Sequence, residues 1–142
     1  MIIRERVKGD KVYFTSAKAV YEFGLKMLEM SDESDRFKER FYVIGLNSKN
    51  NLEYVELASL GILNASLVHP REIMRMACIK AVNAIILMHN HPSGEPAPSE
   101  EDIKITRIIQ HAGETLDIKL LDHVILGEDT FYSFREERRL YD

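Results

Sequence analysis

Two histidines separated by one residue follow a short apolar run. Residues 84–88 are apolar, and His89 and His91 stand directly after them. On extended backbone the side chains of residues i and i+2 point to the same side, so both imidazoles can reach one metal ion. Asp102 lies in the first turn of the next predicted helix and can supply a third ligand at the same rim of the sheet. Two histidines and one carboxylate, with a fourth position for water, form the donor set of a catalytic zinc site.

These residues could form a metal site, or they could be ordinary surface histidines and a helix-capping aspartate. The loop between the histidines and Asp102 helps to choose between the two. Nearby histidines are common in surface loops, and Asp102 stands three residues after Ser99, the spacing of a helix capping box with Asp in place of Glu or Gln. The loop contains three prolines, Pro92, Pro96 and Pro98, which restrict its conformation. A site that must hold its ligands in place needs such stiffness, which favours a metal site over helix capping alone.

The elements that must position these residues alternate between strands and helices. Predicted strands cover residues 40–46, 52–60, 84–88, 120–126 and 130–134, and two short strands around a turn at 8–10 cover residues 2–15. Predicted helices cover residues 17–29, 70–82 and 99–112, the last with Gly113 as the residue just past its end. This alternation predicts an α/β (α+β) domain with a mixed β-sheet flanked by helices.

The composition is that of one globular domain. The 142 residues are 45% hydrophobic and 30% charged, which excludes disorder as the main state. No apolar run approaches the roughly 20 residues that a bilayer span needs, and nothing at the start predicts export. The single cysteine, Cys78, excludes an internal disulfide and a cysteine-rich zinc cage, so we expect a cytoplasmic protein. The net charge of −4, with dispersed Lys and Arg, argues against a dedicated nucleic-acid binder.

The sequence around the histidines resembles two related patterns. The order His-x-His, seven residues, Ser, two residues, Asp fits the JAMM (MPN+) metalloprotease motif without a gap. The stretches 64–72, 89–94, 98–99, 121–127 and 133–136 resemble the RadC family, and the resemblance runs from about residue 17 onward. It implies a JAMM/MPN-like fold with a cytidine-deaminase-like layout. We therefore expect a single RadC-like domain over residues 1–142, without the helix–hairpin–helix segment that often precedes it.

The resemblance also implies a role for each residue of the motif. His89, His91 and Asp102 would bind one zinc ion per chain, and Ser99 would stabilise the oxyanion. An upstream glutamate would hold the water and act as general base, and Glu39, just before a predicted strand, stands at its position. Zinc as a Lewis acid would lower the pKa of its water toward about 7. The implied reaction is hydrolysis of an amide, peptide or isopeptide bond in a protein or peptide substrate.

Several neighbouring residues leave alternatives open. Three other glutamates, Glu33, Glu53 and Glu56, compete with Glu39 for the role of base. Asn90 and Ser93 lie beside the ligands and could orient the substrate or stabilise the loop. Asp122 and His123 are adjacent in a predicted strand, so at most one of them faces the site and supports a ligand imidazole.

Other functions use similar residues. A zinc deaminase needs His-x-Glu followed by Pro-Cys-x-x-Cys, which a chain with one cysteine does not contain. A nuclease could use the same metal, but no basic cluster flanks the loop to hold a phosphate backbone. The principal alternative is a non-catalytic module of the RadC family, associated with DNA repair or with protein interaction. The presence of the whole ligand set and of Glu39 favours catalysis.

Overall fold

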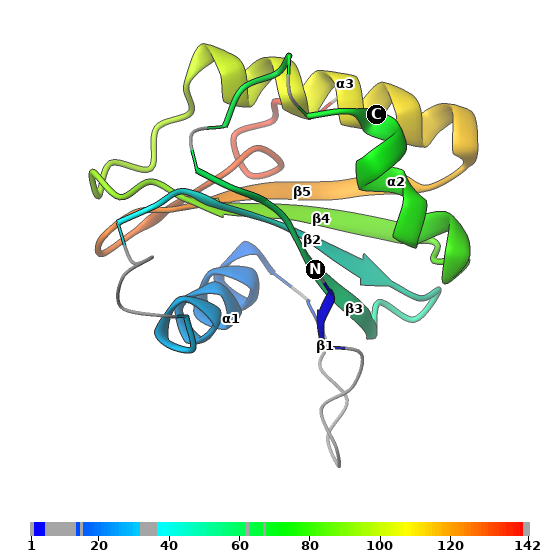
Figure 1. Ribbon diagram of the computed structural model, residues 1–142, viewed down its shortest axis with the longest axis horizontal. Helices are drawn as coiled ribbons and strands as arrows, with labels where there is room; N and C mark the ends of the chain where they lie inside the picture. Colours follow the sequence, from blue (N-terminus) through cyan, green and yellow to red (C-terminus); the bar gives the residue numbers. More distant parts are fainter. Residues whose placement is uncertain are drawn as a thin grey trace.

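One mixed sheet forms the centre of the domain. The computed structural model describes residues 2–4, 14, 16–31, 37–61, 63–66 and 68–140. Within them, six strands pair in the order β1-β3-β2-β4-β5-β6 (Figure 1). These strands are β1 (Ile2–Arg4), β2 (Arg40–Leu46), β3 (Leu52–Leu60), β4 (Ala84–Asn90), β5 (Lys119–Leu126) and β6 (Phe131–Ser133). The β4–β5 pair is parallel and the other pairs are antiparallel, so the predicted mixed α/β (α+β) fold is confirmed.

Three helices cover the two faces of the sheet. Helix α1 (Ala17–Glu29) lies on one face, and α2 (Pro70–Ile79) and α3 (Glu100–Leu116) lie on the other (Figure 1). Each face has its own apolar core. Val20 and Met27 of α1 pack in the first core, whereas Ile73 of α2 and Ile105 of α3 pack in the second. The fold therefore matches the expected JAMM/MPN-like layout.

The strands β2 and β4 are buried along their whole length because helices cover both of their faces. They run antiparallel, with Phe41 opposite His89. The end of β4 and the start of β2 therefore meet at one rim of the sheet. The loop after β4 leads into α3, which brings the start of that helix to the same rim.

Two helix ends differ from the sequence-based expectation. Helix α2 ends at Ile79, three residues before position 82, and Ala81 beyond it has a positive φ of 51°. Helix α3 does not end at residue 112 but continues through Gly113 to Leu116, where Asp117 adopts the left-handed conformation. A Cβ at Gly113 would lie 2.2 Å from the Ile118 carbonyl oxygen. The glycine therefore permits a close contact with the returning chain inside the helix, and its role as the residue past the end was wrongly predicted.

The strand predictions agree with the structure to within a few residues. Strand β4 extends two residues further than expected, which places His89 inside the strand and His91 just beyond it. Strand β6 is shorter than the predicted 130–134. The turn at 8–10 and the second strand of the 2–15 segment lie outside the described residues. Among the helices of the described part, none is both long and apolar enough to cross a bilayer.

Candidate metal centre

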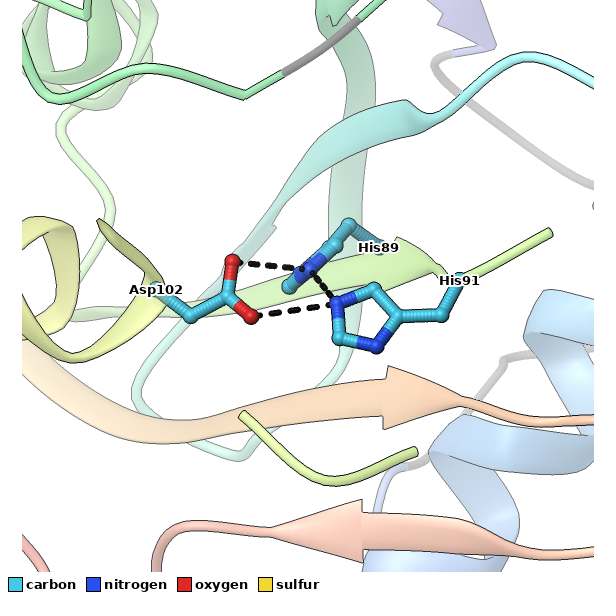
Figure 2. A group of neighbouring side chains, drawn as sticks. All are labelled: His89, His91 and Asp102. Atoms are coloured by element: carbon cyan, nitrogen blue, oxygen red, sulfur yellow. Dashed lines mark hydrogen bonds and ion pairs between the residues drawn. The ribbon is translucent and has the colours of Figure 1, made fainter. Parts of the chain in front are cut away.

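Three side chains converge at the rim where β4 ends and α3 begins (Figure 2). The Nε2 atom of His89 lies 3.2 Å from Oδ1 of Asp102, and the Nε2 atom of His91 lies 3.0 Å from Oδ2 of the same carboxylate. The two Nε2 atoms lie 2.9 Å from each other. The expectation that i and i+2 side chains at the strand end share one side is thus confirmed, and the structure brings the third predicted ligand to them.

This triangle fits a metal ion of the zinc type. Donors bonded to one tetrahedral ion at 2.0–2.1 Å lie about 3.3 Å apart, close to the separation of the two Nε2 atoms and to the distance from each of them to one of the two Asp102 oxygens. Two imidazole nitrogens that face each other and one carboxylate are also the donor types that zinc prefers. The residues present can therefore hold such an ion, with a fourth position left open.

The other ring nitrogen of each histidine is held from outside the triangle. Nδ1 of His91 lies 2.8 Å from the carbonyl oxygen of Glu95, in the proline-containing loop. Nδ1 of His89 lies 2.8 Å from Nε2 of His123. A histidine that binds a metal usually donates its second N–H to such an acceptor, which fixes the ring and its tautomer. The arrangement therefore suits two rings that present Nε2 to a metal.

Asp102 caps helix α3 and also lies against both histidines. The Ser99 hydroxyl accepts from the Asp102 N–H at 3.1 Å, and the Asp102 carboxylate accepts from the Ser99 N–H at 2.8 Å. This is a complete capping box at the start of α3. Burial by itself would raise the pKa of Asp102, but the hydrogen bonds with His89 and His91 hold it well below its usual range. The helix cap therefore holds an ionised carboxylate in position against the histidines.

The pKa of the His91 imidazole is shifted by its neighbours in the site. Its pKa is raised, first by the hydrogen bond with Asp102, while partial burial acts in the opposite direction. The charge of Glu39 also raises the pKa of His91, so the Glu39 carboxylate lies within electrostatic reach of the ligands.

Glu39 lies at the same rim of the sheet. Phe41 of β2 pairs with His89 of β4, and the Arg40 N–H donates to the Asn90 side chain, so Glu39, the residue just before β2, lies at the end of the sheet where His91 follows β4. One carboxylate oxygen of Glu39 accepts from the Leu63 N–H at 3.0 Å. The side chain is thus held at the rim by the segment that follows β3.

The rival glutamates do not share this position. Glu53 accepts from the Asn47 side chain at the opposite end of the β2–β3 hairpin. Glu56 lies in the middle of β3, beside Val43 of β2, where burial raises its pKa. Glu33 lies outside the described residues. Glu39 is thus the described candidate that the fold brings to the rim.

The structure also separates the other residues singled out in the sequence. His123 faces the site, whereas Asp122 faces the opposite side of the sheet and accepts from Ser133 and from the backbone of Arg135. Ser93 is exposed and accepts from the Glu95 N–H within the loop. The Asn90 side chain bonds to the backbone on either side of Glu39.

One buried polar residue of the site was missed by sequence reasoning. Thr106 lies 2.6 Å from Nδ1 of His123 through its Oγ1 atom. The available signal was its spacing, since a residue four positions after Asp102 lies on the same face of a helix. That spacing does not reveal the partner, which comes from β5.

The fold and the donor set together define a JAB/MPN-like domain, in which a His-x-His strand end faces an aspartate on the next helix. A family model described as a RadC-like JAB domain matches residues 14–140. The chain therefore belongs to the RadC-like JAB family, as its sequence motifs predicted.

Curated bacterial relatives carry the name UPF0758 protein. The chain is 48% identical over 130 residues to one from Caldanaerobacter subterraneus, covering 92% of this chain and 54% of the relative. It is 47% identical over 106 residues to one from Chlorobium phaeovibrioides, covering 75% of this chain and 48% of the relative. The chain thus spans about half the length of the curated relatives it matches.

Proposed function

We propose that this domain is a zinc-dependent metallohydrolase that cleaves a peptide or isopeptide bond. The observation that carries the proposal is the convergence of His89, His91 and Asp102, with both Nε2 atoms aimed at one point and both Nδ1 atoms engaged elsewhere. Membership of the RadC-like JAB family supports the same conclusion.

The chemistry divides among the metal and two residues of the chain. A zinc ion held at this point supplies Lewis acidity, which makes water a nucleophile near neutral pH. The Glu39 carboxylate, at the same rim of the sheet as the ligands, takes the proton of the attacking water and delivers it to the leaving amine nitrogen. The Ser99 hydroxyl already accepts from the Asp102 N–H, so its own proton is available to donate to the developing oxyanion.

The first experiment measures zinc by elemental analysis in protein purified without added metal. We expect about one zinc per chain in the wild type and in a His111→Ala control, because His111 is an exposed residue near the end of α3. We expect none in His91→Ala. A wild type that takes up no zinc even when zinc is supplied would reject the metal site and favour the non-catalytic module.

The second experiment tests the role of Glu39. We expect Glu39→Gln to keep its zinc and to lose hydrolysis of a quenched fluorescent peptide or isopeptide library by about 10²–10⁴-fold. Glu53→Gln serves as the matched control, because that residue lies at the far end of the hairpin. Equal loss in the two variants, or loss of zinc from Glu39→Gln, would remove Glu39 as the base.

A further inference from the structure

The hydrogen bonds behind His89 form a chain that returns to the backbone of Asp102. His89 Nδ1 lies 2.8 Å from His123 Nε2, and His123 Nδ1 lies 2.6 Å from Thr106 Oγ1. The Thr106 hydroxyl donates to the carbonyl oxygen of Asp102 at 2.7 Å. His123 and Thr106 therefore join two of the three candidate ligands behind the site, one on a strand and one on a helix.

Only one arrangement of protons along this chain leaves His89 able to bind a metal. Nε2 of His89 must be unprotonated, so the ring proton sits on Nδ1 and is donated to His123 Nε2. His123 then carries its own proton on Nδ1 and donates it to Thr106, whose single hydroxyl proton goes to Asp102. In the reverse arrangement, His89 would carry a proton on Nε2, aimed at His91 and Asp102 in the place of the metal.

The surroundings of His123 keep its ring in line with both partners. The side chain is fully buried. Phe134 stacks on it with ring centroids 4.9 Å apart and an interplanar angle of 8°. Phe41 meets it edge-on, with centroids 5.9 Å apart. Rotation of the ring is blocked by these contacts, so its two nitrogens stay directed at His89 and Thr106.

We propose that His123 and Thr106 are positioning residues of the metal site. They fix the tautomer and orientation of His89 and tie it to the helical turn that carries Asp102. Neither contacts the metal or the substrate. The inference rests on the proposed metal site. It adds the two residues that keep His89, the ligand on β4, in the tautomer that can bind a metal.

The first test compares zinc affinities, measured by competition with a chromophoric chelator at fixed pH. We expect Thr106→Val, which keeps the shape but removes the hydroxyl, to bind zinc about 10–100-fold more weakly. Thr106→Ser keeps the hydroxyl and should bind like the wild type. Ser133→Ala is the matched control, because it removes a buried hydrogen bond to Asp122 on the opposite face of the sheet. Wild-type affinity in Thr106→Val would overturn the proposal.

The second test reads the proton positions in the zinc-loaded wild type, by long-range ¹H–¹⁵N NMR spectra of the histidine rings. If His123 only packed in the core, either tautomer of its ring would serve, whereas the proposed role requires one of them. We expect its proton on Nδ1, with Nε2 unprotonated. His123→Gln, which retains an acceptor, should keep more zinc affinity than His123→Phe, which retains only the aromatic stack.

The two possible failures give different results. If the proposed metal site is wrong, the wild type itself takes up no zinc, and this inference falls with it. If only this inference is wrong, the wild type binds zinc while its His123 carries the proton on Nε2.

Discussion

The side-chain amide of Asn90 spans the backbone on both sides of Glu39. Its Oδ1 accepts from the Arg40 N–H at 2.7 Å, and its Nδ2 donates to the Lys38 carbonyl oxygen at 3.2 Å. Asn90 is also the residue between His89 and His91, so alternation along the strand turns it away from them. The residue that separates the two histidines thus sets the backbone position of the proposed base.

Asn90→Asp tests this relationship. The variant keeps an acceptor for the Arg40 N–H but places a carboxylate oxygen against the Lys38 carbonyl. We expect a loss of about 1–3 kcal/mol in the free energy of unfolding, because the buried side chain at position 90 exchanges a donor for a charged acceptor that faces the Lys38 carbonyl. We also expect slower hydrolysis with zinc content unchanged, because Glu39 shifts while the ligands do not. Urea unfolding, elemental analysis and initial rates measure the three quantities.

The matched control for that variant is Asn64→Asp. The Asn64 Oδ1 atom accepts from the exposed Ser66 N–H, which a carboxylate can also do. We expect this variant to behave like the wild type in all three measurements. A loss of zinc from Asn90→Asp would instead mean that Asn90 supports the ligands rather than Glu39.

Ser99 can be tested with its capping role separated from its catalytic role. A glycine at a helix N-cap costs only a few tenths of a kcal/mol, whereas alanine costs about 1 kcal/mol. We therefore expect Ser99→Gly to unfold in urea almost like the wild type. Ser99→Gly and Ser99→Ala should each lose about 10²–10³-fold in hydrolysis rate, because each removes the hydroxyl proposed to donate to the oxyanion.

The expected rescue of Ser99 comes from threonine, which restores a hydroxyl at the same position. Ser99→Thr should recover most of both the stability and the rate, measured by the same unfolding and kinetic experiments. A Ser99→Gly variant that hydrolyses at the wild-type rate would leave Ser99 with helix capping alone.

The elements of the fold could be predicted because their signals are local. The strands β2 and β4 are apolar at nearly every position, and the alternation of side chains placed His89 and His91 on one face. The spacing of Ser99 and Asp102 predicted a capping box that the structure contains. Each of these signals comes from a few neighbouring residues.

What the sequence could not decide depends on pairing between distant segments. Alternation states that Asp122 and His123 face opposite ways but not which one faces the site. The parallel register of β4 and β5 decides it, because His123 lies beside Leu87, two residues before His89. The end of α3 was missed for a local reason instead, because Asp117, and not a glycine, takes the left-handed conformation that ends the helix, while Gly113 stays inside it.

The stability of the metal-free protein should depend on pH through His91. The hydrogen bond with Asp102 raises the pKa of His91 above its ordinary value of 6.5. Proton binding to His91 therefore stabilises the fold, fully below pH 6.5, and this contribution disappears as the pH rises through the raised pKa. We expect urea unfolding of the metal-free wild type to show this loss and that of His91→Gln to lack it.

Zinc competes with the same proton. Its affinity for the wild type should therefore rise across the pH window in which the metal-free protein loses stability. A His91→Gln variant with the same pH dependence of stability as the wild type would assign the effect to another group.

The loop that holds His91 should be sensitive to one methyl group at Gly127. A Cβ there would lie 2.6 Å from the Gly94 carbonyl oxygen, next to the Glu95 carbonyl that meets the His91 ring. We expect Gly127→Ala to lose about 1–3 kcal/mol of stability by overpacking and to bind zinc more weakly, because the loop must shift. The matched control is Gly113→Ala, which overpacks against Ile118 instead. Gly113 lies 11 residues after Asp102, about 16 Å along helix α3 and so away from the metal site. The control variant should lose comparable stability in urea and keep wild-type zinc affinity, so equal losses of affinity in the two variants would attribute the effect to general destabilisation.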